Sequence, residues 1–159
     1  MAKVKQYPSQ EVLRYLFDVI DGNLVWKVDR GRKTRKGSIA GYTHPKYGYI
    51  DVKFDGSSYK AHRLVYIWYN GDIPDGIEID HINRQRADNR IENLRLVTKQ
   101  ENSYNRESKG YYWHKKDKRF IAQIQVEGTW LYLGSYIIEE EAKNAYKEAK
   151  IKYHIIKGK

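Results

Sequence analysis

An aspartate and a histidine are adjacent at positions 80 and 81, and an asparagine follows at position 102. The carboxylate of Asp80 and the amide oxygen of Asn102 are hard oxygen ligands, of the kind that Mg²⁺ or Mn²⁺ takes. Histidine has an unperturbed pKa of about 6.5, so His81 is suited to accept a proton from an attacking water at neutral pH. A divalent metal site beside a general base predicts hydrolysis of a phosphodiester bond.

The charge of the chain points to a polyanionic partner. Its 159 residues include 30 Lys and Arg against 20 Asp and Glu, which gives a formal net charge of +10 and favours nucleic acid. The absence of cysteine excludes disulfides, cysteine-ligated zinc and thiol nucleophiles. The longest apolar stretch is far shorter than the roughly 20 residues of a membrane span. We therefore expect no membrane partner and a cytoplasmic protein, in the host cell if a phage encodes it.

The elements that must position these residues are predicted from local patterns. Short strands are expected at Ile77–Asp80 and Leu94–Val97, with a polar loop between them. A helix should begin at Thr98, because Thr98 and Glu101 have the spacing of a capping box, and it should end near Gly110. This order places Asp80 and His81 at the end of a strand and Asn102 in the first turn of a helix.

The segments before position 77 are expected to support that region. A helix is predicted over residues 9–18, strands over 23–27 and 49–54, a hairpin into 57–61, and a buried short helix over 62–69. His62 is expected to pack between this hairpin and this helix rather than to bind metal. The basic run at 30–37 has two open interpretations, a solvated loop and a phosphate contact.

The last fifty residues predict a second unit of three strands and one helix. The strands are expected at 111–114, 120–126 and 130–133, and the helix at 139–153. Alternation directs Ala122, Ile124, Leu131 and Leu133 toward the helix and the residues between them to the open face. We therefore predict an α+β protein with domains at 1–108 and 109–159.

A family resemblance rests on the residues that carry the chemistry. Asp80-His81, Asn93-Leu94-Arg95, Glu101-Asn102 and the upstream run Ala61–Val65 are similar to the ββα-metal signature of HNH endonucleases, particularly those of phages and their introns. The similarity covers roughly residues 15–108. It implies a metal-dependent endonuclease, of the phage or homing type, that cuts double-stranded DNA with Mg²⁺ or Mn²⁺.

The same resemblance implies a role for each site residue. His81 would be the general base, Asp80 and Asn102 the metal ligands, and Asn93 the residue that holds the loop and orients His81. Many family members have a histidine at the final position, where this chain has Asn102. That departure is shared by a phage-intron branch, so it changes the subgroup rather than the expected function.

A second resemblance covers the C-terminal unit and rests on Gly110–Trp113, Arg119–Ile124, Tyr132–Tyr136 and Glu140–Ala142. These segments look like the Apetala-type DNA-binding domain of plant ethylene-response factors. That domain lays its three-stranded sheet in the major groove. Several arginines of the plant proteins are replaced here, by Tyr112, His114, Gln125 and Trp130, so their sequence preference does not transfer. An exposed aromatic face covered by the N-terminal unit is the alternative interpretation.

Basic and polar residues complete the predicted DNA-binding surface. Around the metal site the candidates for phosphate contact are Arg84, Arg86, Arg90 and Arg95, with ordinary surface charge as the alternative for each. In the C-terminal unit the candidates are Lys115, Lys118, Arg119, Gln123, Gln125, Trp130 and Tyr132. Two other functions stay open: a non-catalytic DNA-binding regulator on a decayed nuclease fold, and an RNA-binding module that stacks bases on Tyr and Trp.

Overall fold

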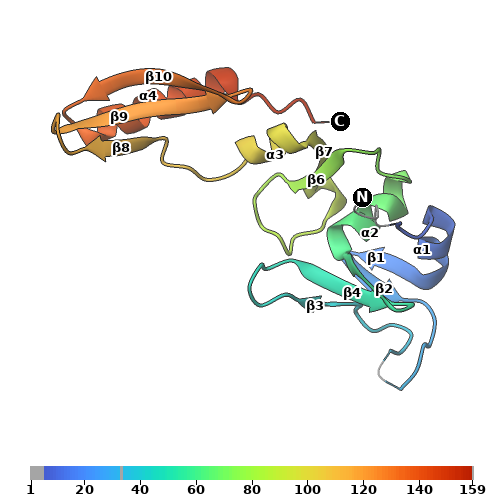
Figure 1. The fold of residues 1–159 in the computed structure, drawn as a ribbon. Helices are drawn as coiled ribbons and strands as arrows, with labels where there is room; N and C mark the ends of the chain where they lie inside the picture. The colour runs from blue at the N-terminus through green and yellow to red at the C-terminus, as the bar shows by residue number, and fades with distance from the viewer. Residues whose placement is uncertain (1–5, 33, 159) are drawn as a thin grey trace. The chain divides into compact units, whose positions relative to one another are not determined.

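The computed structural model describes residues 6–32 and 34–158, which form an α+β structure with small antiparallel sheets (Figure 1). A first compact unit ends at Leu96, and a second runs from Val97 to Gly158. These units are defined by packing, so the domain limits expected from the sequence, 1–108 and 109–159, stay a prediction. Lys33 of the basic run lies outside the described residues. None of the described helices is long and apolar enough to cross a membrane.

The described residues of the first unit form three small sheets and two helices. Its elements are α1 (Gln10–Leu16), β1 (Phe17–Ile20), β2 (Asn23–Trp26), β3 (Tyr42–Thr43), β4 (Ile50–Phe54), β5 (Ser57–Lys60), α2 (Ala61–Asn70), β6 (Ile77–His81), the 3-10 turn η1 (Ile91–Asn93) and β7 (Leu94–Thr98). Strands β1 and β2 pair with each other, β4 lies between β3 and β5, and β6 pairs with β7.

Helix α1 is shorter than the sequence predicts. The side chain of Ser9 accepts a hydrogen bond from the amide of Val12, as expected of an N-cap, but the helix ends at Leu16. Phe17 instead begins β1 and pairs with Trp26, and the two ring centroids are 4.3 Å apart. Packing of Phe17 in the core therefore overrides the helical periodicity that suggested a helix to residue 18.

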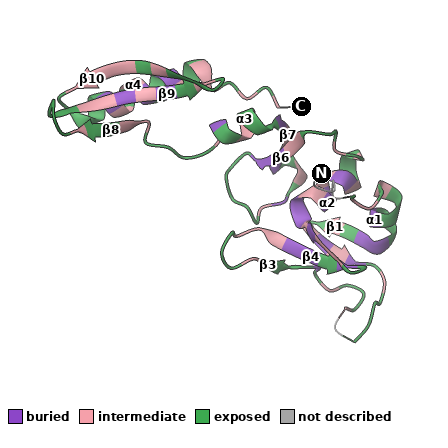
Figure 2. Ribbon diagram, in the orientation of Figure 1, coloured by how far each residue is buried: buried purple, intermediate pink, exposed green. Residues whose placement is uncertain are grey.

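The core of the first unit fixes the strands and α2 around it. Figure 2 shows buried residues on α2 and on the strands of this unit. Leu64, Val65 and Ile67 of α2 are almost completely buried and belong to the same core as Phe17 and Trp26. Burial of each such side chain contributes about 1.5–3 kcal/mol. This packing holds the first turn of α2, which contains His62, and the end of β6 in place.

The second unit is the predicted three-stranded antiparallel sheet with one helix against it. Its elements are α3 (Lys99–Tyr104), β8 (Tyr111–His114), β9 (Arg119–Val126), β10 (Thr129–Tyr136) and α4 (Glu139–Tyr153), with β9 in the middle of the sheet. Ala122 and Ile124 are buried, and Leu131 and Leu133 pack on the core beneath α4, so the predicted inner face is confirmed.

Helix α3 ends at Tyr104, well before the predicted end near Gly110. Tyr104 is buried and its ring stacks on His154, with centroids 4.0 Å apart. The residues from Asn105 to Gly110 include no apolar side chain that could continue a buried helical face. The helix therefore stops at its last packed residue.

The turn between β1 and β2 approaches the loop between β6 and β7 closely. Gly22, in this turn, has a φ of +78°, and a Cβ atom there would lie 2.6 Å from the carbonyl carbon of Asn89 and would also overlap the backbone nitrogen of Arg90. Gly56, in the Asp55-Gly56 turn between β4 and β5, has a similar φ of +72° but open space around it. Only glycine at position 22 lets the two segments meet.

These two glycines give a matched test. In both Gly22→Ala and Gly56→Ala the positive φ should cost about 1–2 kcal/mol of unfolding free energy. Gly22→Ala should lose at least about 2 kcal/mol more, because the methyl group overlaps backbone that cannot rotate away. Urea unfolding of both variants measures the difference. Equal losses would show that the turn and the loop are not in contact.

Candidate active site

The buried polar side chains gather at one place in the first unit. In residues 6–32 and 34–158, the buried polar or charged residues are Asp51, His62, Asp80, His81, Asn89 and Asn93. Asp51 is paired with Lys60, at 2.7 Å. The other five come from the start of α2, the end of β6, and the loop and turn that follow. Burial of so many polar groups costs free energy unless they are hydrogen-bonded.

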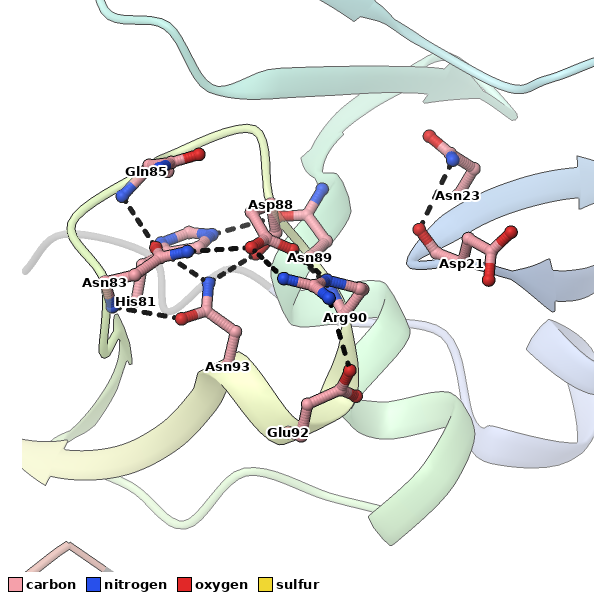
Figure 3. A network of polar contacts seen from close by, with 10 residues as sticks. All are labelled: Asp21, Asn23, His81, Asn83, Gln85, Asp88, Asn89, Arg90, Glu92 and Asn93. Atoms are coloured by element: carbon pink, nitrogen blue, oxygen red, sulfur yellow. Dashed lines mark hydrogen bonds and ion pairs between the residues drawn. The ribbon is translucent and has the colours of Figure 1, made fainter.

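Asn93 closes the loop between β6 and β7 (Figure 3). Its amide nitrogen donates to Oδ1 of Asn83, at 3.0 Å, and to the main-chain oxygen of Asp88, at 2.7 Å. Its amide oxygen accepts from the backbone N–H of Asn83, at 3.0 Å. One side chain thus ties the beginning of the loop to its end. This geometry suits the loop-holding role that the family resemblance implies for Asn93.

Asn89 is hydrogen-bonded to His81. Nε2 of His81 lies 2.9 Å from Oδ1 of Asn89, and Asn89 is 2% exposed (Figure 3). Because an amide oxygen can only accept, Nε2 carries the proton and Nδ1 is the basic nitrogen of the ring. The sequence did not single out Asn89, since the loop contains several asparagines and no spacing distinguishes this one.

Asp80 forms an ion pair with Arg95. Nε and Nη2 of Arg95 lie 3.0 and 2.7 Å from Oδ2 of Asp80, across the β6–β7 pair. Arg95, a predicted phosphate contact, is thus bound to the proposed metal ligand. The described residues contain no group of three or more His, Cys, Asp or Glu that could hold a metal. The predicted ligands, the carboxylate of Asp80 and the amide oxygen of Asn102, are not a group of that kind. Both are oxygen donors, which are the ligands that Mg²⁺ and Mn²⁺ prefer.

Asn102 belongs to α3 in the second unit, and its place in that helix is as predicted. Oγ1 of Thr98 accepts from the backbone N–H of Glu101 at 3.2 Å, and the carboxylate of Glu101 accepts from the backbone N–H of Thr98 at 2.8 Å. The hydrogen bond that the carboxylate accepts from the backbone N–H of Thr98, with others from the backbone N–H of Lys157 and the Thr98 hydroxyl, lowers the pKa of Glu101. The predicted capping box is therefore confirmed, and Asn102 follows it in the first turn.

The other predicted arginines differ in their contacts. Arg90 makes a bidentate contact with the carboxylate of Asp88, at 2.8 Å for each hydrogen bond (Figure 3). The Arg90 guanidinium holds the pKa of Asp88 well below its usual range. Arg86 donates to the main-chain oxygen of Tyr47, at 3.0 Å. Arg84 lies in the same loop with a positive φ of 63°.

The predicted DNA-binding residues of the second unit share its open face or an adjoining turn. Gln123 pairs with Tyr132 across the strands, and Gln125 pairs with Trp130. Trp130 is 59% and Tyr132 66% exposed. Arg119 begins β9, and Lys115 and Lys118 lie in the turn between β8 and β9. The structure thus brings the polar and aromatic residues to one face and the basic residues to one end.

Sequence comparisons identify the region that contains this loop. A model of the HNH endonuclease family matches residues 59–104, from β5 through α3. These residues therefore form an HNH endonuclease family domain within the chain. The family segment contains His62, Asp80, His81, Asn89 and Asn93, which are the five clustered buried polar residues, and it ends just after Asn102.

Individual relatives of the chain come from a prophage, a virus and a phage. YosQ, an SPbeta prophage protein of Bacillus subtilis (strain 168) whose name assigns it to the HNH homing endonucleases, is 40% identical over 65 residues, 41% of this chain. An HNH endonuclease of Acanthamoeba polyphaga mimivirus, described as uncharacterized, is 34% identical over 100 residues, 62% of this chain. Protein 3.8 of Escherichia phage T7 is 35% identical over 81 residues, 44% of this chain.

The matched regions are only part of each relative. The matches cover 34% of YosQ, 50% of the mimivirus protein and 67% of Protein 3.8. The HNH protein therefore spans half or less of the first two relatives. No solved structure matches the chain.

The contact between His81 and Asn89 predicts the tautomer of the histidine ring. In Asn89→Ala the ring should lose its single Nε2–H form and exchange between tautomers, because the acceptor that selects this form is gone. Asn89→Asp keeps an acceptor oxygen and should keep the Nε2–H form. Correlation of the ring ¹⁵N and ¹H signals measures the tautomer. A His81 spectrum unchanged in Asn89→Ala would mean that another group orients the ring.

Proposed function

We propose that the HNH protein is a metal-dependent endonuclease of the phage or homing type that hydrolyses phosphodiester bonds of double-stranded DNA. The observation that carries the proposal is the buried contact between His81 and Asn89, next to Asp80 and inside the family segment. A buried histidine with a fixed tautomer has the properties of a general base. The net charge of +10 favours a polyanionic substrate.

Each residue of the site has a proposed task. Nδ1 of His81 accepts a proton from the attacking water, while Asn89 keeps the proton of Nε2 in place. Asp80 and Asn102 would hold Mg²⁺ or Mn²⁺, as the family resemblance implies, and Arg95 orients the carboxylate of Asp80 by its two hydrogen bonds. When bound, the metal ion stabilises negative charge on the phosphate and the leaving oxygen. Asn93 keeps the loop closed around His81.

Two of the four candidate arginines near the site are proposed to support it rather than to contact DNA. Arg90 and Arg95 act on the carboxylates of Asp88 and Asp80, and they support the loop and the metal ligand. Arg84 and Arg86 are the proposed contacts to DNA phosphates. A cation already paired with a carboxylate releases fewer counterions from DNA, so it contributes less to affinity.

The second unit is proposed to bind the DNA duplex as an Apetala-type domain. Supporting this, its sheet has three strands with one helix on the inner face, and its open face exposes Trp130 and Tyr132 beside Gln123 and Gln125. A cavity of about 500 Å³ is lined by Tyr112, Gln123, Gln125, Trp130 and the basic Arg106 and Lys109, among other residues. Glutamine can pair with adenine edges in the major groove.

A non-catalytic DNA-binding regulator is the second candidate function. A decayed nuclease would be expected to lack its general base or a metal ligand. Asp80, His81 and Asn102 are all present in the sequence, and the loop after His81 is closed by the hydrogen bonds of Asn93. The catalytic proposal is therefore preferred, and a cleavage assay separates the two.

Cleavage of supercoiled plasmid tests the catalytic assignments. The wild-type protein should nick or linearise plasmid with Mg²⁺ or Mn²⁺ and should be inactive in EDTA. His81→Ala should lower the rate by about 10²–10⁴-fold with nearly unchanged DNA affinity, because it removes proton transfer and little charge. Asp80→Ala should prevent rescue by added metal. His44→Ala, a histidine outside the site, is the matched control and should cleave normally.

Two outcomes would contradict this assignment. Full activity in EDTA would remove the metal from the mechanism, and wild-type turnover by His81→Ala would remove the base. DNA binding without any cleavage by the wild-type protein, with either metal, would favour the regulator.

The second unit makes a separate prediction about sequence preference. Gln123→Ala should relax preference at particular base pairs, by about 1–3 kcal/mol for a lost bidentate contact. Lys118→Ala should weaken all duplexes alike and reduce the salt slope by about one unit, since phosphate contacts act through counterion release. Binding to a panel of duplexes at two salt concentrations measures both effects. Equal behaviour of the two variants would assign the sheet a structural role, and tighter binding to single-stranded RNA would favour RNA recognition.

A further inference from the structure

Two aromatic rings meet the ring of the proposed base in the first unit. Tyr49 comes from the residue before β4, His62 from the first turn of α2, and His81 from the end of β6. The ring centroids of His62 and His81 are 5.0 Å apart with an interplanar angle of 72°. The ring centroid of Tyr49 lies 5.3 Å from that of His62 and 6.0 Å from that of His81. We call Tyr49 and His62 the aromatic wall.

His62 contributes to this wall as an uncharged ring. It is 7% exposed, and its Nδ1 is buried without a hydrogen-bond partner in the described part of the chain. Burial, with further contributions from His81 and two basic neighbours, lowers the pKa of His62 to about 3. The ring is therefore neutral at physiological pH. Its contact with His81 is one of shape and packing, with no charge or hydrogen bond at Nδ1.

Tyr49 is itself held by two cations. Nζ of Lys60 lies 5.5 Å and Cζ of Arg86 5.0 Å from the centroid of its ring. Such contacts contribute about 0.5–1 kcal/mol each at exposed sites and more when desolvated. Lys60 is tied in turn to the buried carboxylate of Asp51. The ring of Tyr49 is thus fixed by contacts that do not involve His81.

The rings beside His81 restrict the plane of its imidazole. The torsion between Cβ and the ring of histidine is broad, since it joins sp³ and sp² atoms. The hydrogen bond from Nε2 to Asn89 restrains this torsion at one atom of the ring. The ring centroids of His62 and Tyr49, 5.0 and 6.0 Å from that of His81, restrict it further. The orientation of Nδ1 therefore depends on the wall as well as on Asn89.

We propose that His62 and Tyr49 are positioning residues that hold the imidazole of His81 in the orientation selected by Asn89. This inference rests on the proposed function, because it assumes that His81 is the general base. It assigns His62 a role through its flat ring and none in binding metal or transferring protons. The position of a reacting group matters, because a misplacement of about 1 Å can lower the rate roughly 10²-fold.

The test compares His62→Ala with His62→Phe in single-turnover plasmid cleavage. His62→Ala should lower the rate of the chemical step by about 10²-fold with DNA affinity unchanged, because only the orientation of the base is lost. His62→Phe keeps a flat ring and should cleave at least tenfold faster than His62→Ala. His44→Ala is the matched control, since His44 also contacts a tyrosine ring, Tyr47 at 4.8 Å, but lies outside the cluster.

Two outcomes would overturn the proposal. Wild-type rates in His62→Ala would show that the wall is dispensable. A His62→Phe protein as inactive as His62→Ala, with wild-type unfolding temperature, would show that a ring nitrogen is needed. If His62→Ala does not fold, His62→Leu replaces it, because leucine fills the volume without a flat ring and should show the same loss.

A second readout separates this inference from the proposed function. Ring ¹⁵N and ¹H signals of His81, recorded in EDTA, should be broadened or doubled in His62→Ala and sharp in His62→Phe. This holds whether or not the protein cleaves DNA. A wild-type protein without nuclease activity would contradict the proposed function, whereas an unchanged His81 signal in His62→Ala would contradict the positioning role.

Discussion

Closure of the loop between β6 and β7 by buried amide groups is the constraint on which the candidate site depends. Asn93 binds both the start of the loop at Asn83 and its later part at Asp88. Opening the loop would leave these amide groups without partners, at about 1–3 kcal/mol for each one that stays buried. The same closed loop brings Asn89 to His81. The hydrogen bonds that close the loop therefore also position Asn89, which is hydrogen-bonded to the proposed base.

Ion pairing decides which of the many cations are available to a substrate. Composition alone counts Arg90 and Arg95 toward the net charge of +10 and toward DNA binding. The structure pairs them with Asp88 and Asp80, where they stabilise the loop and the proposed metal ligand. An arginine bound to a carboxylate still adds to the long-range field, but it contributes less to local phosphate contact. The basic composition thus indicates the class of partner without locating the contact.

Features set by neighbouring residues could be predicted, and features set by distant packing could not. The capping box at Thr98, the Asp55-Gly56 turn and the two faces of β9 each depend on short-range spacing, and each is present. Phe17 was expected in a helix, but its ring packs against Trp26 and the residue joins a strand. Asn89 was missed for the same reason, since its contact with His81 exists only once the loop has folded.

The two proposed metal ligands are positioned by different kinds of interaction. Asp80 depends on the pairing of β6 with β7 and on Arg95, which lies 15 residues further along the chain. Asn102 depends on the local junction at Thr98, which is both the last residue of β7 and the N-cap of α3. Because no loop separates the strand from the helix, the cap alone fixes where the helix begins. A helix of six residues is marginal without such a cap. The place of Asp80 therefore depends on long-range strand pairing, whereas the place of Asn102 in its helix depends on a local cap.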